Sequence, residues 1–160
     1  MKRPCFFSLL MLLLMLALQA SGQQITSSTD SEIVKPRIRV VIDNDFGGDP
    51  DGLFQLAHQL LSPSTDVRAI ICSHHYKDFY GYSGKVAEAQ KQVVKLLEVM
   101  HKKGLPVYLG SDSSFVSPQK PLYSEGAEAI IHEAMRDDSR PLYIVCGAAL
   151  TNIASAYLLH

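Results

Sequence analysis

The sequence contains no tryptophan and few cysteines, and its charges almost cancel. It has 15 Lys and Arg residues and 16 Asp and Glu residues, so the formal net charge is -1. This balance gives no electrostatic attraction for nucleic acid or for an anionic membrane surface, and we expect neither as a partner. The three cysteines are Cys5, Cys72 and Cys146, too few for a disulfide framework.

Long apolar runs are also absent except for one near the N-terminus. Residues 6–18 are apolar, two basic residues precede them at 2–3, and small residues follow at 20–22. This pattern predicts a cleaved signal peptide over residues 1–22, with an uncleaved membrane anchor as the alternative. Cleavage would give a secreted or periplasmic protein with no stable membrane insertion.

Apolar strands and helices alternate along the rest of the chain. Residues 23–36 are polar and rich in Ser and Thr, which is typical of a flexible leader. Residues 37–160 then form one domain of alternating elements. The expected strands are 37–43, 67–72, 106–109 and 142–146, and the expected helices are 53–61, 84–101, 125–135 and one from 150 onward. This order predicts an α/β fold: an open, mostly parallel, Rossmann-like sheet with helices on both faces.

The strand ends of such a sheet indicate where a ligand would bind. In open α/β sheets the binding crevice lies outside the carboxyl ends of the strands. The segments that follow the four expected strands are 43–51, 72–76, 110–114 and 146–149. We therefore expect these segments to surround one site.

The first of these segments is rich in aspartate. Asp43, Asp45, Asp49 and Asp51 place four carboxylates within nine residues, at the mouth of a low-dielectric crevice. A hard divalent cation would relieve their repulsion, because Ca²⁺ and Mg²⁺ take carboxylate oxygens as ligands. The alternative is a solvated turn whose acids cap the following helix. The spacing excludes an EF-hand loop.

Three segments carry a family resemblance. They read VVIDNDFGGDPDGLFQLA, LPVYLGSD and LYIVCGAALTNIASA. In this order and spacing they resemble the N-terminal half of the inosine-uridine-preferring nucleoside hydrolase family, over residues 37–160. The resemblance implies calcium-dependent hydrolysis of the N-glycosidic bond of ribonucleosides, with a nucleoside or a related ribosyl compound as substrate.

The resemblance also implies roles for individual residues. Asp45 would bind Ca²⁺ and deprotonate the attacking water. One of Asp49 and Asp51 would bind Ca²⁺, and the other would hold ribose hydroxyls. Asp43 would support the loop beside the substrate, and the backbone carbonyl of Gly147 would be a further calcium ligand. Asn152, in the Leu-Thr-Asn-Ile-Ala helix start, is a further candidate for contact with substrate.

The sequence departs from the family pattern in three places. The acid loop is one residue longer between Asp49 and Asp51, which leaves their assignment open. His74 and His75 stand where the family often has a ribose-binding Asn, as substrate contacts or as exposed loop residues. The family's last calcium-binding Asp lies in a C-terminal half, so we expect this chain to be an incomplete copy. A homo-oligomer is left open.

Two other functions fit parts of the pattern. Haloacid-dehalogenase-type phosphatases also begin with a strand that ends in Asp-x-Asp, and they use Mg²⁺. They normally have Thr or Val where this chain has Gly47, and they do not need the GAALTNIA segment. A secreted, non-catalytic sugar- or nucleoside-binding module would keep the metal-binding loop without completing catalysis.

The predicted topology has two further consequences. A 3-2-1-4 strand order would place the first strand between Cys72 and Cys146, about 9–10 Å apart, too far for a disulfide. The last helix would present apolar side chains with no surface to cover, so residues 23–160 alone should be poorly soluble and inactive. These side chains are Ala154, Tyr157, Leu158 and Leu159.

Overall fold

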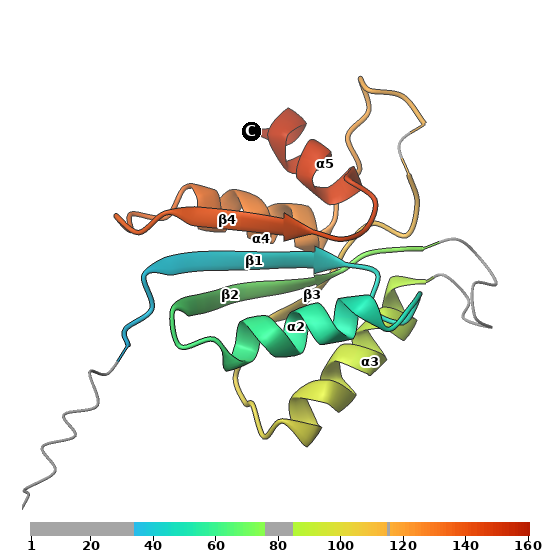
Figure 1. Ribbon diagram of the computed structural model, residues 1–160. Helices are drawn as coiled ribbons and strands as arrows, with labels where there is room; N and C mark the ends of the chain where they lie inside the picture. Colours follow the sequence, from blue (N-terminus) through green and yellow to red (C-terminus); the bar gives the residue numbers. More distant parts are fainter. Residues whose placement is uncertain (1–33, 76–84, 115) are drawn as a thin grey trace, which may run out of the picture. The chain divides into compact units, whose positions relative to one another are not determined.

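Four parallel strands form the sheet at the centre of the chain (Figure 1). The computed structural model describes residues 34–75, 85–114 and 116–160. The strands are β1 (Ile38–Asn44), β2 (Thr65–Cys72), β3 (Val107–Leu109) and β4 (Leu142–Cys146). Their order is β3-β2-β1-β4, which confirms the predicted open parallel α/β fold.

The sequence-based expectations for the N-terminus lie almost entirely outside the described residues. The predicted signal peptide, and the leader up to residue 33, belong to this part of the chain. The described part from residue 34 onward forms the unit Val34–His160. None of the helices in this described part has the length and apolarity needed to cross a membrane.

Helices cover both faces of the sheet, as predicted. They are α2 (Asp51–Leu61), α3 (Val86–Val99), α4 (Glu125–Ala134) and α5 (Thr151–Leu159). Side chains alternate along β1, so Val40 and Ile42 pack with α2 and α3, whereas Val41 packs with α4 and α5. Burial of both strand faces explains why the strands are continuous apolar runs.

Some boundaries differ from those expected. The helix α2 begins at Asp51, two residues before the expected start, because Pro50 already has a helical φ of -75°. The strand β2 begins at Thr65 rather than residue 67, and its register with β1 shifts by one residue between Val40 and Val41. Arg68 is the residue left without a partner in β1.

The two cysteines of the sheet lie on opposite sides of β1. Cys72 pairs with Asn44, whereas Cys146 pairs with Asp43. Both thiols are free, as predicted from the strand order. Burial raises the pKa of the Cys72 thiol to about 12, and Asp43 adds to the shift. A thiol in this environment stays protonated and unreactive.

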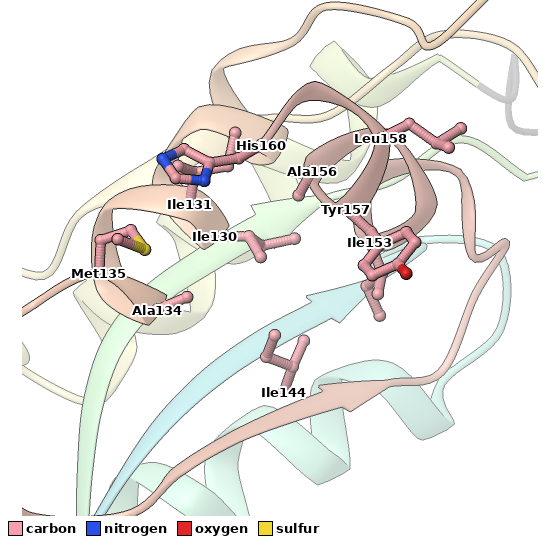
Figure 2. A pocket seen from close by; sticks show the side chains of 10 residues that line it. All are labelled: Ile130, Ile131, Ala134, Met135, Ile144, Ile153, Ala156, Tyr157, Leu158 and His160. Atoms are coloured by element: carbon pink, nitrogen blue, oxygen red, sulfur yellow. The ribbon is translucent and has the colours of Figure 1, made fainter. Parts of the chain in front are cut away.

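A hollow of about 680 Å³ lies between β4 and the helices α4 and α5. Figure 2 shows the apolar side chains around it. The residues that line it are Ile130, Ile131, Ala134, Met135, Ile144, Ile153, Ala156, Tyr157, Leu158 and His160. Tyr157 is 83% exposed, and Leu158 and Leu159 are also exposed, as expected from the sequence.

A charged cluster holds α4 against the amino end of β1. The Arg39 side chain is buried and donates hydrogen bonds to the carbonyls of Glu133 (2.8 Å) and Arg140 (3.1 Å). Its guanidinium lies 3.6 Å from the Glu133 carboxylate and 3.8 Å from that of Asp138. Arg136 adds a second cation, with Nη2 2.6 Å from Glu133. Buried charges at this end of the sheet therefore have opposite charges beside them.

The pKa values of this cluster reflect the pairing. Burial alone would raise the pKa of Glu133, but the hydrogen bond from Arg136 and the charge of Arg68 outweigh it and lower the pKa. Hydrogen bonds from Arg140 hold the pKa of Asp138 well below its usual range. Both acids are therefore ionised at neutral pH.

Candidate functional site

The acid loop lies at the carboxyl edge of the sheet, where the arrowheads of β1 and β4 point in Figure 1. It leaves β1 at Asn44 and enters α2 at Asp51. Phe46 anchors the loop, because its side chain is fully buried in the core beneath. Gly47 has a φ of 116°, which a residue with a side chain rarely adopts, so the turn requires glycine there.

The loop folds tightly around Asp45. The backbone N–H of Gly48 donates to the Asp45 carbonyl at 2.8 Å. A Cβ atom at Gly48 would lie 3.1 Å from Oδ2 of Asp45, so a larger residue would press on the carboxylate. Gly47 and Gly48 therefore allow the loop to close around Asp45.

Asp43 lies below the loop and is fully buried. The Ser73 hydroxyl donates to its carboxylate, and Nδ2 of Asn152 lies 3.3 Å from both of its oxygens. Burial raises the pKa of Asp43 to about 6, although the hydrogen bonds from Ser73 and Asn152 and the charge of His74 lower it. Asp45 adds a smaller upward contribution. Asp43 therefore supports the site from within the protein.

Asn152 joins the ends of several elements through one amide group. Its Nδ2 donates to the Ser73 hydroxyl at 2.7 Å, and its Oδ1 accepts from the Ser111 backbone N–H at 2.9 Å and the Ser124 hydroxyl at 3.1 Å. The side chain is 1% exposed. Gly110 is needed beside it, because a Cβ there would lie 2.5 Å from Nδ2. The amide is thus engaged by protein groups, and the substrate contacts suggested for Asn152 and Asp43 stay predictions.

The three serines around Asn152 were not predicted from the sequence as part of the site. Ser73 and Ser111 each follow a strand, which is the only sequence signal that they share. Ser124 is the N-cap of α4, and its hydroxyl accepts the N–H of Ala127 at 3.1 Å. Its second contact, with Asn152, depends on a helix 28 residues away.

Asp45, Asp49 and Asp51 lie close enough for the charge of one acid to affect the pKa of the next. Burial raises the pKa of Asp45, and Asp51 adds to the shift, while a backbone hydrogen bond and the two histidines oppose it. Asp49 and Asp51 lie within hydrogen-bond reach of each other, which raises the pKa of Asp51. Atom Oδ1 of Asp49 is buried with no hydrogen-bond partner in the structure. A buried oxygen without a donor is costly and suggests that a bound group completes the site.

His74 and His75 lie beside the acid loop. Atom Nδ1 of His74 is 2.9 Å from the Ser111 carbonyl, and Nε2 is 3.1 Å from the Ser114 hydroxyl. The carbonyl can only accept, so Nδ1 carries a proton, and Nε2 lies within hydrogen-bond distance of the Ser114 hydroxyl. His74 lowers the pKa of Asp43 and Asp45, and His75 lowers that of Asp45. The structure thus brings both histidines to the acids.

Gly147 lies across β1 from the histidines. Its backbone N–H donates to the Asp43 carbonyl at 3.0 Å and so extends the pairing of β4 with β1. The residue is exposed. The structure therefore places this predicted backbone ligand at the same edge as the acid loop.

The donor chemistry of the loop fits a hard cation. Carboxylates and a backbone carbonyl are ligands for Ca²⁺ and Mg²⁺, and the unpartnered oxygen of Asp49 is available for such a role. Within the described ranges, however, no three His, Cys, Asp or Glu side chains are grouped so that they could hold a metal ion. The described residues supply suitable ligands without already gathering them at one point.

The fold and the site define an open parallel α/β protein with acids collected at the carboxyl edge of its sheet. No family model and no curated protein matches the chain. Any more specific assignment therefore depends on the sequence motifs and the site geometry.

Proposed function

We propose that this chain carries the acid loop of a calcium-dependent hydrolase that cleaves ribonucleosides into base and ribose. The observation that carries the proposal is the set of acids at the carboxyl end of β1. The pKa values of Asp45 and Asp51 are raised, and an oxygen of Asp49 is buried without a partner. The motif resemblance supplies the reaction, because the same acids occur in nucleoside hydrolases in the same order.

Asp45 is the proposed general base. It is half-buried, and its raised pKa makes its carboxylate a stronger base than an exposed aspartate. Bound Ca²⁺ would supply a water of lowered pKa and a hold on the sugar diol. Asp45, one acid of the Asp49–Asp51 pair and the carbonyl of Gly147 are the proposed ligands.

The remaining residues would position the ribose. The acid of the Asp49–Asp51 pair that does not bind the cation can accept hydrogen bonds from ribose hydroxyls. His74 is fixed by the Ser111 carbonyl and can donate or accept at the rim of the site. Cleavage of an N-ribosidic bond builds positive charge on the sugar, which nearby carboxylates stabilise.

The test is hydrolysis of a ribonucleoside panel by the full-length protein that contains this acid loop, with and without Ca²⁺, measured as free base by chromatography. Asp45→Asn removes the base and should lower turnover by about 10²- to 10⁴-fold. Asp137→Asn is the matched control, because Asp137 is an exposed acid in the loop before β4 and far from this edge in the topology. Equal activity of both variants would contradict the role of Asp45.

The same experiment separates the alternatives. Calcium-dependent binding of ribonucleosides without release of base would support the binding-module function. Magnesium-dependent phosphate release would support a phosphatase. The geometry gives that function little support, because the phosphatase nucleophile would be Asp43, whose side chain is fully buried and hydrogen-bonded to Ser73 and Asn152.

We also propose that residues 1–22 export the chain. N-terminal sequencing of the exported protein would test this, with a mature terminus near residue 23 as the expected result. A terminus at Met1 on a membrane-bound product would instead support the uncleaved anchor.

A further inference from the structure

Asn44, the residue between Asp43 and Asp45, lies in a slot between two glycines from different elements. Gly52 belongs to the first turn of α2, and Gly147 follows β4. A Cβ atom at Gly52 would lie 3.1 Å from Cγ of Asn44, and one at Gly147 would lie 2.7 Å from the same atom. The Asn44 side chain, which is 3% exposed, therefore fits only because both neighbours lack side chains.

Both polar atoms of this amide are used within the protein. Atom Oδ1 accepts the backbone N–H of Asp45 at 2.8 Å, and Nδ2 donates to Oε1 of Gln55 on α2 at 2.8 Å. One atom must accept and the other must donate, so an amide satisfies the slot and an aliphatic side chain does not. Because both atoms face protein groups and the residue is buried, Asn44 is not placed to contact a substrate.

The three contacts connect the proposed catalytic groups. Asn44 fixes the backbone where Asp45, the proposed base, leaves β1. Its bond to Gln55 links that point to α2, which begins at Asp51. Its contact with Gly147 sets how closely the segment with the proposed carbonyl ligand approaches β1. One buried side chain thus governs the spacing of groups from three elements.

We propose that Asn44 is a positioning residue for the ribosidase reaction and acts through Asp45 and Gly147. This inference rests on the proposed function. It predicts that the fit between Asn44 and Gly147 controls turnover, although neither side chain would touch the substrate.

The experiment is a double-mutant cycle on the full chain with Asn44→Ala, Gly147→Ala and the combination. The methyl group of Gly147→Ala collides with the amide and should lower kcat by about 100-fold, because small displacements at a reacting centre have effects of that size. Asn44→Ala loses one hydrogen bond to Asp45 and should lower kcat by about 10-fold. The double variant should return to the level of Asn44→Ala, since the new methyl occupies the space that the amide left. His58→Ala, at an exposed residue of α2, is the control and should change kcat by less than about 3-fold.

Each result either supports or refutes the role of Asn44 as a positioning residue. A double variant no better than Gly147→Ala alone would refute the slot. An Asn44→Ala protein with a lower Tm but unchanged kcat and KM would show a merely structural role. If the wild-type protein hydrolyses no nucleoside, the proposed function fails. The fit between Asn44 and Gly147 is then tested by the rise in Tm that Ca²⁺ causes. That rise should be reduced in Gly147→Ala and restored in the double variant, and an equal rise in all proteins would overturn the inference.

Discussion

Buried charged side chains have different surroundings at the two ends of β1. At the amino end, the buried Arg39 is surrounded by acids whose pKa values are lowered, such as Glu133. At the carboxyl end, Asp43 and Asp45 have raised pKa values, and Asp49 has an oxygen without a partner. The same strand, seven residues long, therefore begins among acids with lowered pKa values and ends among acids with raised ones.

This difference distinguishes charges that are paired and stabilise the fold from charges that belong to the proposed site. A chain that pairs its buried ions at one end of the sheet could pair them at the other, for example with an arginine beside Asp43. It places neutral donors there instead, the hydroxyl of Ser73 and the amide of Asn152. Uncompensated acids in a crevice are typical of binding and catalytic sites, so the comparison itself supports the carboxyl edge as the site.

The largest expected effect comes from breaking the compensated end. Arg39→Ala would leave the buried Glu133 and the partly buried Asp138 without this cation, at a cost of about 4 kcal/mol in the free energy of unfolding. Urea denaturation would measure it. Arg37→Ala, at an exposed arginine two residues earlier, is the control and should cost less than about 0.5 kcal/mol. Similar losses in both variants would contradict the assignment of a compensated cluster.

At the other end of β1, the next largest effect should follow from Asn152→Ala. It would remove donors to Asp43 and Ser73 and the acceptor for Ser111 and Ser124, leaving buried polar groups without partners. We expect a loss of about 3 kcal/mol, from penalties of about 1–3 kcal/mol per group. The matched change is Asn152→Asp, which keeps the acceptor but sets a carboxylate beside Asp43. A stability of Asn152→Ala within 0.5 kcal/mol of the wild type, about the spread of neutral surface changes, would contradict the network.

The two ends should also respond to pH with opposite signs. The pKa of Asp43 rises from its ordinary 3.8 to about 6 on folding, so the folded state holds this proton more tightly. The stability it contributes is present below pH 4 and lost as the pH rises to 6, by at most about 3 kcal/mol. Glu133, with a lowered pKa, loses its contribution as the pH falls below about 4. Urea unfolding of Asp43→Asn at pH 4, 5 and 6 in the presence of EDTA measures this. The variant should lose the pH dependence assigned to Asp43 and keep the one assigned to Glu133.

The smallest expected effect is the change in stability caused by Ca²⁺, which extends the comparison between the two ends of β1. At a concentration ten times the dissociation constant, a bound ion would stabilise the protein by about 1.4 kcal/mol, visible as a rise in Tm that EDTA reverses. Asp51→Asn at the carboxyl edge should reduce this rise, whereas Asp66→Asn at the amino end should leave it unchanged. A rise that depends equally on both acids would place the ion elsewhere.

The fold was predictable from the sequence because its signals are local. Continuous apolar runs marked the strands, and the alternation with helices gave the parallel order that places β1 between Cys72 and Cys146. The acid loop was visible for the same reason, since its four acids lie within nine residues.

The supporting contacts were not predictable, because they join residues that are distant in sequence. Asn152 reaches Asp43 across 109 residues, and Arg39 reaches Glu133 across 94. A single asparagine or arginine in a sequence gives no indication of its partner. The slot around Asn44 depends likewise on Gly147. Residue 147 must lack a side chain because β4 lies beside β1, and only the structure shows that pairing in detail.

The separation between Asp43 and Asn152 has a consequence for how the chain is made. Synthesis proceeds at about 5 to 20 residues per second, so Asn152 is added about 5 to 20 s after Asp43. During that interval the nascent chain holds an aspartate whose amide donor does not yet exist. The strands can pair as they emerge, but the acid edge acquires its native hydrogen bonds only when the helix that carries Asn152 docks. The helix that carries Asn152 therefore gives Asp43 its amide donor well after β1 has been made.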